Sequence, residues 1–157
     1  MPIQRLTELL DKNNIKYITI RHSQAYTAQE IAAQTHISGN EFAKSVLFKH
    51  NGKLTMAVLP ASHHVNLDRL KNEIGNFEIR LAYEQEFIDI FSDCEPGAMP
   101  PFGNLYGLDM YADKSLSKNE ELAFNACNHK EVIRMSYKKW LDLVKPILID
   151  FASPTRT

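Results

Sequence analysis

Residues 44–60, KSVLFKHNGKLTMAVLP, are the stretch that most constrains the fold. Two runs of strand-forming residues flank Asn51 and Gly52, and Asn-Gly is a favoured pair in the two-residue type I′ turn of a β-hairpin. Pro60 lacks a backbone N–H and is expected to end the second strand. The sequence therefore predicts an antiparallel hairpin.

Other elements surround this hairpin at irregular spacing. Apolar periodicity and capping residues predict helices over residues 3–13, 27–35, 66–75, 83–91 and 136–145. The expected caps are Thr27 and Ser136 at helix starts and Gly75 at a helix end. Runs rich in β-formers predict strands over residues 15–20, 77–82, 107–113, 121–128 and 131–137. Because strands and helices do not alternate regularly, we predict an α+β fold with a mixed, largely antiparallel sheet and surrounding helices. The tail, residues 150–157, is expected to fray.

The composition is that of an ordinary globular protein. The 157 residues are 44% hydrophobic and 24% charged, which predicts one domain over residues 1–157. A net charge of −1 gives no sign of a DNA partner. The absence of a long apolar run or a signal-peptide core predicts no membrane association. Two cysteines, Cys94 and Cys127, predict no disulfide framework, so a reduced cytoplasmic protein is expected.

A second stretch, FSDCEPGAMPPFGNLYGL at residues 91–108, holds three of the seven prolines and three of the six glycines. Such a run excludes a helix or a central strand. Its apolar residues exclude a plain solvated linker. Two interpretations stay open, a rigid connection or a backbone platform whose free N–H groups stabilise an oxyanion.

Single residues give weaker signals. Lys44, which begins the hairpin, suits a phosphate or carbonyl oxygen, although a surface lysine is more common. His63 and His64 lack partners at metal-ligand spacing, which favours turn or surface histidines. Cys94 and Cys127 lack the context of a cysteine hydrolase, which favours buried or incidental thiols.

Three motifs occur in an order that is more specific than any one of them. They are the lysine that begins the hairpin, here Lys44, the G-x-x-x-P loop at residues 97–101, and the strand MYAD that ends at Asp113. From about Ile15 to about Val144, the sequence resembles the YbaK / prolyl-tRNA synthetase-associated editing domain family.

The resemblance implies a free-standing aminoacyl-tRNA deacylase that hydrolyses the ester of a mischarged tRNA, commonly tRNA-Pro. It implies that Lys44 holds the substrate's 3′ end and that the loop backbone faces the reacting ester. Water attacks with help from a ribose hydroxyl, so no cofactor, metal or protein nucleophile is expected. The implied partners are the acceptor end of a mischarged tRNA and a prolyl-tRNA synthetase. The implied site residues are Lys44, Gly97 and Ala98 for catalysis, and Ser45, Met99, Pro100, Pro101, Asp113 and Asn125 for substrate binding.

Departures from the family leave the amino acid open. Many relatives have serine and glycines where this chain has Asn125, Ala126 and Cys127, and relatives vary at the position of Ser45. Met99, Pro100 and Phe102 are candidates for shaping the pocket, where one methylene changes selectivity by roughly 1–3 kcal/mol. Two alternatives remain, a non-catalytic binding module that uses the same pocket and a thiol hydrolase that uses one of the cysteines.

Overall fold

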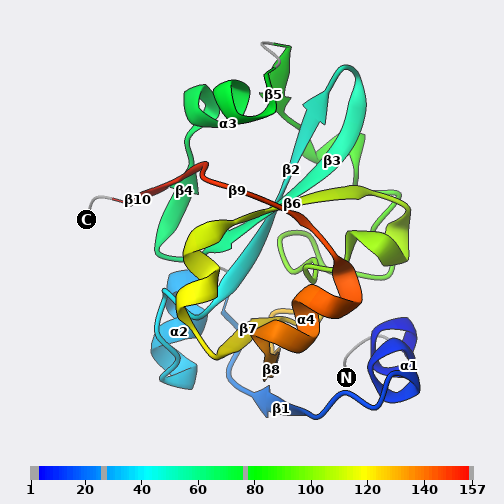
Figure 1. Ribbon diagram of the computed structural model, residues 1–157. Helices are drawn as coiled ribbons and strands as arrows, with labels where there is room; N and C mark the ends of the chain where they lie inside the picture. The colour runs from blue at the N-terminus through cyan, green and yellow to red at the C-terminus, as the bar shows by residue number, and fades with distance from the viewer. Residues whose placement is uncertain (1–3, 26–27, 76–77, 156–157) are drawn as a thin grey trace.

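The computed structural model describes residues 4–25, 28–75 and 78–155. Figure 1 shows strands at the centre with helices around them. The helices are α1 (Gln4–Lys12), α2 (Ala28–Thr35), α3 (Leu67–Ile74) and α4 (Tyr137–Val144), with 3₁₀ turns at Glu84–Glu86, Gly103–Tyr106 and Lys114–Lys118. The strands are β1 (Tyr17–Arg21), β2 (Ala43–His50), β3 (Lys53–Pro60), β4 (His63–Val65), β5 (Ile79–Leu81), β6 (Asp109–Asp113), β7 (Glu121–Asn125), β8 (Glu131–Ser136), β9 (Ile147–Ile149) and β10 (Ala152–Pro154).

The predicted hairpin lies at the centre of a five-stranded sheet with the order β5-β2-β3-β6-β9. Asn51 and Gly52 have φ values of 53° and 75°, the positive angles that a type I′ turn requires. Strand β3 pairs with β2 antiparallel and with β6 parallel, and β9 adds a second parallel pair. Nearly every residue of β3 is buried, as expected for a strand covered on both faces.

Two smaller sheets complete the fold. Strands β1, β8 and β7 form an antiparallel sheet at the lower end of the hairpin in Figure 1, and β10 pairs with β4. A parallel bridge between Phe42 and Ala123 joins the start of β2 to β7. Five of the seven strand pairs described are antiparallel, which confirms the predicted α+β class with mixed, largely antiparallel pairing.

Three apolar clusters fill the spaces between these layers. The largest packs α1 and α4 against the hairpin and β7, and includes the fully buried Trp140 and Phe124. A second lies between the other face of the central sheet and α3, around Phe48 and Phe151. The third, around Phe42, lies at the bridge between the sheets. The bridge is therefore fixed by packing on both sides.

Local capping follows the sequence closely. The Asn66 side chain accepts a hydrogen bond from the N–H of Arg69 at the start of α3, and Gly75 ends that helix with a φ of 77°. Ser136 caps α4 in the predicted manner. The predicted cap of α2, Thr27, lies outside the described residues.

Two predicted elements are wrong. Residues 83–91 form a 3₁₀ turn followed by further turns instead of a helix. Of the apolar residues in that segment, Phe91 is buried while Ile88 and Ile90 are 42% exposed, so no continuous apolar face exists to stabilise a helix. The tail does not fray up to residue 155, because β10 pairs with β4 and Phe151 is fully buried.

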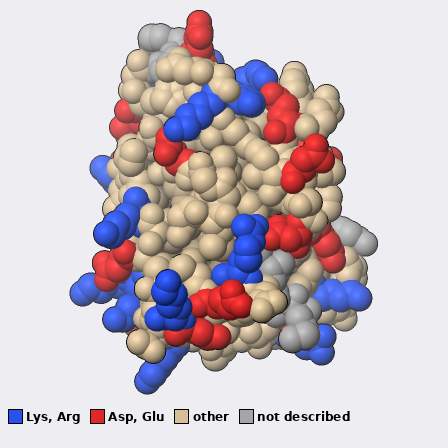
Figure 2. Space-filling model, turned by 90° about the vertical axis from the view of Figure 1, so that its right-hand side faces the viewer, with Lys and Arg blue, Asp and Glu red and all other residues tan. Residues whose placement is uncertain are grey.

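The surface mixes charges of both signs. Figure 2 shows one face whose uncharged centre is surrounded by interspersed acidic and basic side chains, without a continuous basic area. No helix among the described residues is long and apolar enough to cross a membrane. The expectation of one domain over residues 1–157 stays a prediction.

Candidate functional site

Lys44 carries a partly buried charge that the fold leaves unpaired. It lies near the start of β2, opposite Leu59 of β3. Within the described part of the chain, its amine has no hydrogen-bond acceptor and no carboxylate within ion-pair distance. Burial lowers the pKa of Lys44 below the ordinary lysine value. A partly desolvated cation without a counter-ion is unfavourable, so this position favours the binding of an anion.

Two buried polar atoms on β2 and β7 are among those that lack partners in the described residues, as is the Tyr137 hydroxyl on α4. Ser45 Oγ and Asn125 Oδ1 are inaccessible to solvent and accept or donate no hydrogen bond among the residues described. Strands β2 and β7 run parallel from the bridge between Phe42 and Ala123, and Lys44 and Asn125 each lie two residues beyond it. The structure thus places a free cation and two unsatisfied groups at the junction of the sheets. Buried polar groups without partners are uncommon and indicate a place where a ligand binds.

The G-x-x-x-P loop is held against the end of β7. The N–H of Glu95 donates to the carbonyl of Cys127 at 2.8 Å, and the N–H of Cys127 donates to the carbonyl of Ala98 at 3.0 Å. Gly97 lies between these two bonds with a φ of 84°, a conformation that glycine adopts without strain. A Cβ atom at Gly97 would lie 3.6 Å from the His129 ring, in ordinary contact. Backbone conformation rather than space therefore explains the glycine.

The other end of the loop is held by α4. The indole N–H of Trp140 donates to the carbonyl of Pro101 at 2.9 Å, in a fully buried position. Met99, Pro100 and Pro101 are all buried, and Met99 belongs to the main core cluster. This burial accounts for the rigidity of the loop, while the predicted substrate-binding role of these three residues stays a prediction.

Few N–H groups remain in this loop. Prolines have none, so only Gly97, Ala98 and Met99 can donate between residues 96 and 101. The N–H of Ala98 donates to the carbonyl of Glu95 at 3.0 Å. The N–H groups of Gly97 and Met99 have no acceptor in the described ranges. A rigid loop with two free donors can stabilise negative charge that develops on a bound oxygen.

Asp113 has a different environment from the one expected. Its Oδ1 accepts from the backbone N–H groups of Phe151 and Ala152, each at 2.9 Å. Its Oδ2 accepts from the N–H and the hydroxyl of Ser115. Burial raises the pKa of Asp113, but these hydrogen bonds outweigh it and hold the pKa below the ordinary value. The carboxylate is fully used in joining β6 to the C-terminal segment, which gives no support to a substrate-binding role.

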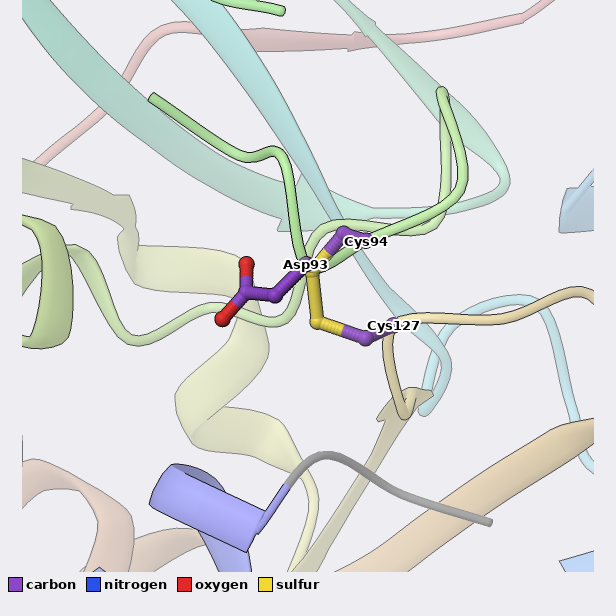
Figure 3. Close-up of side chains that lie close together, drawn as sticks. All are labelled: Asp93, Cys94 and Cys127. Carbon is purple, nitrogen blue, oxygen red and sulfur yellow. A yellow bond between two sulfur atoms is a disulfide. The ribbon is translucent and has the colours of Figure 1, made fainter. Parts of the chain in front are cut away.

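The sequence reasoning missed a disulfide beside the loop. Cys94 and Cys127 are joined, with their Cα atoms 4.4 Å apart, so the prediction of two free thiols is wrong. Figure 3 shows the pair next to Asp93. These three residues form the only cluster of metal-type ligands found among the described residues. Bonded to each other, the sulfur atoms are not thiolate ligands or nucleophiles.

An open cavity of about 640 Å³ lies against the disulfide. It is formed by the residues that precede the loop and by the turn between β7 and β8, and side chains of both charges line it. The lining residues are Arg21, Gln24, Ser92, Asp93, Cys94, Glu95, Cys127, Asn128, Lys130 and Glu131.

Comparisons with known proteins identify the family of this chain. A family model described as an aminoacyl-tRNA editing domain matches residues 22–143. The proline–tRNA ligase of Bacillus mycoides (strain KBAB4) is 28% identical over 89 residues, which are 57% of this chain but only 16% of that ligase. The match thus spans a small part of the curated relatives.

Solved structures share the fold over almost the whole chain. A crystal structure described as "a putative trans-editing enzyme for prolyl tRNA synthetase" aligns with a TM-score of 0.80 and 20% identity, over 96% of each chain. A crystal structure of a hypothetical protein aligns with a TM-score of 0.85 and 17% identity, over 96% of this chain and all of the other. At such identities the likeness establishes the fold alone.

Proposed function

Because the chain belongs to the aminoacyl-tRNA editing domain family, we propose that it is a cytoplasmic deacylase acting on mischarged aminoacyl-tRNA in trans. The substrate we propose is mischarged tRNA-Pro, presented alone or with a prolyl-tRNA synthetase. One observation carries the proposal: among the residues described, a half-buried amine without a counter-ion lies at the sheet junction, where Ser45 and Asn125 also have unpaired polar atoms.

Lys44 binds a phosphate of the terminal nucleotide. An ammonium group pairs with a phosphate oxygen as a compact point charge, and partial burial strengthens this attraction relative to bulk water. The contact orients the acceptor end but does not itself break the ester.

The loop supplies the electrostatic part of catalysis. Water attacks the ester carbonyl carbon, and the N–H groups of Gly97 and Met99 stabilise the oxyanion of the tetrahedral intermediate. Collapse of the intermediate releases the free amino acid and the ribose hydroxyl of the tRNA. An aminoacyl ester is already reactive, so orientation and two fixed donors are sufficient without a protein nucleophile.

Ser45 and Asn125 contact the aminoacyl group in this proposal. A buried polar atom that gains a partner only from substrate discriminates strongly against substrates that lack that partner. The near-neutral net charge and the mixed charges in Figure 2 predict modest tRNA affinity, in keeping with recruitment through a synthetase.

The test is hydrolysis of radiolabelled tRNA-Pro that carries alanine, cysteine, serine or proline. We expect one mischarged species to be hydrolysed, and Lys44→Ala to reduce the rate at least about 100-fold. The matched control is Lys49→Ala, on the same strand, whose amine lies near Glu86 and away from the junction. Full activity of Lys44→Ala would refute the role of Lys44.

A non-catalytic module is the second candidate, since unsatisfied groups at Ser45 and Asn125 suit a bound ligand whether or not it reacts. It predicts saturable binding of aminoacyl-tRNA without turnover of any species. Hydrolysis of even one species excludes it. The disulfide argues against the third alternative, a thiol hydrolase.

A further inference from the structure

The Cys94–Cys127 bond lies at the base of the G-x-x-x-P loop. Cys94 is three residues before Gly97, and Cys127 is two residues after Asn125. A Cα–Cα distance of 4.4 Å lies within the range that disulfides span. The covalent link therefore joins two of the three segments that contribute groups to the candidate site, the loop and the end of β7.

The same segments are joined by hydrogen bonds. The bonds from Glu95 to Cys127 and from Cys127 to Ala98 lie immediately beside the disulfide. Cys127 itself has a φ of 69°, a left-handed conformation that costs energy for a residue with a Cβ atom. The disulfide and these two bonds thus hold the first half of the loop against the turn, whereas Trp140 holds its other end.

A small thiol can reach this bond. Cys94 is partly exposed, whereas Cys127 is only 3% exposed, and both line the open cavity of about 640 Å³. The Tyr106 hydroxyl lies 3.4 Å from Cys94 Sγ and 3.7 Å from Cys127 Sγ, and it donates to Asp93. The Tyr106 oxygen can also accept a hydrogen bond from the S–H group of a reduced cysteine. The surroundings of the two sulfur atoms are therefore compatible with both the disulfide and the dithiol.

We propose that Cys94 and Cys127 form a reversible thiol–disulfide exchange site, reduced by a dithiol, whose redox state sets the order of the G-x-x-x-P loop and so the deacylase rate. The effect on rate rests on the proposed function, whereas the exchange and the loop ordering do not. Disulfides in reducing compartments are usually transient or redox-sensing, which agrees with a reversible bond.

The exchange is a two-electron reaction. A thiolate of the dithiol attacks Cys94 Sγ, the accessible sulfur, and Cys127 leaves as a thiolate that takes up a proton. The second thiol of the reductant then attacks the mixed disulfide and releases Cys94 as a thiol. The protein gains two electrons and two protons, and the reductant leaves as a cyclic disulfide. Glutathione disulfide reverses the change and yields two glutathione molecules.

Reduction loosens the loop because it removes the covalent link between the base of the loop and the end of β7. The hydrogen bonds of Glu95 and Ala98 on either side of Gly97 must then hold these two segments together without it, so they open more often. Displacement of a positioning group by about 1 Å lowers a rate up to about 100-fold.

The experiment measures three quantities in dithiothreitol and in glutathione disulfide. Alkylation with mass spectrometry counts free thiols, amide hydrogen exchange reports on residues 95–99, and the aminoacyl-tRNA panel reports the rate. We expect two thiols after reduction and none after oxidation, faster exchange in the reduced loop, and a rate at least about tenfold lower. Cys94→Ser should behave as the reduced protein under both conditions.

Cys127→Gly is a second variant, because glycine suits a φ of 69° and preserves folding. It should also lose the redox response. Two alkylated cysteines in excess glutathione disulfide, or loop exchange that is the same in both states, would overturn the proposal. If no aminoacyl-tRNA is hydrolysed in either state, the proposed function fails. The thiol count and the amide hydrogen exchange would still show whether the disulfide is reversible and whether its redox state changes the order of the loop.

Discussion

Replacing Asp113 tests whether a buried carboxylate serves the fold or the substrate. The side chain is 3% exposed and accepts four hydrogen bonds, two from the backbone of Phe151 and Ala152 and two from Ser115. In Asp113→Asn, one amide oxygen can keep the pair of bonds from residues 151 and 152. The amide NH₂ then faces the N–H of Ser115, which loses its acceptor, while the Ser115 hydroxyl must turn from donor to acceptor.

The magnitude follows from those bonds. A hydrogen bond to a charged group contributes about 1.5–3 kcal/mol, and a buried donor left without an acceptor costs about 1–3 kcal/mol. We therefore expect Asp113→Asn to lower the free energy of unfolding by about 2–4 kcal/mol. At about 2–4 °C for each kcal/mol in a protein of this size, Tm should fall by roughly 4–16 °C.

The assay is thermal and urea unfolding beside deacylation per folded molecule. The matched control is Asp109→Asn, four residues earlier on β6, where an exposed carboxylate pairs with Lys53 and contributes about 0–1 kcal/mol. A normal Tm for Asp113→Asn with lost deacylation would refute the structural role and return Asp113 to the substrate site. A lower Tm with normal activity of the folded fraction would confirm the structural reasoning.

The pH dependence of the same variant has a defined sign. The pKa of Asp113 in the folded protein lies below its unfolded value, which is about 3.9. Its ionised form therefore stabilises the fold fully above that value, and the stabilisation is lost as pH falls through the folded pKa. The difference in stability between wild type and Asp113→Asn should be constant near neutrality and shrink in acid below about pH 4.

Three further predictions concern the loop, α4 and Lys44. Gly97→Ala forces a side chain into a φ of 84° and should lower the free energy of unfolding by about 1–2 kcal/mol and reduce deacylation. Gly107→Ala, at a φ of 68° away from the loop, should lower the free energy of unfolding by a similar amount without reducing the rate. Ser136→Ala removes the cap of α4 and should lower stability to urea by about 0.5–2 kcal/mol; no change in the urea midpoint would contradict the cap. The lowered pKa of Lys44 means that its charge is lost at a lower pH than for a free lysine. As pH rises, binding of a non-hydrolysable aminoacyl-tRNA analogue should therefore weaken for wild type before it weakens for Lys44→Arg.

Local signals were sufficient for most of the elements. The Asn51-Gly52 turn, the Gly75 stop of α3 and the Ser136 cap depend on residues close together in the sequence, and the structure confirms each of them. The failures arise where distant contacts decide. Residues 83–91 have helical spacing, but the exposure of Ile88 and Ile90 leaves a helix there without an apolar face to bury. The tail is ordered by Asp113, 38 residues before Phe151 in the chain, which no local pattern reveals.

The cysteine pair shows the same limit. Cys94 and Cys127 are 33 residues apart, and only the pairing of the loop with the end of β7 brings their Cα atoms to 4.4 Å. The count of two cysteines argues against a disulfide framework in general but says nothing about one bond between converging segments.

In this fold, the buried polar groups that the protein itself pairs are structural, and those that it leaves unpaired are the candidates for function. Asp113 was as plausible a site residue as Lys44 from the sequence, yet every acceptor position of its carboxylate is occupied by the protein. Lys44 and Asn125 are partly or wholly buried with unused hydrogen-bonding capacity, and the loop leaves the N–H groups of Gly97 and Met99 free in the described part of the chain. Because folding rarely leaves buried polar groups unpaired without a reason, the unpaired groups are where a substrate would gain most in binding. If a bound aminoacyl-adenosine analogue left these groups unpaired and contacted the Asp113 carboxylate instead, this argument would be wrong.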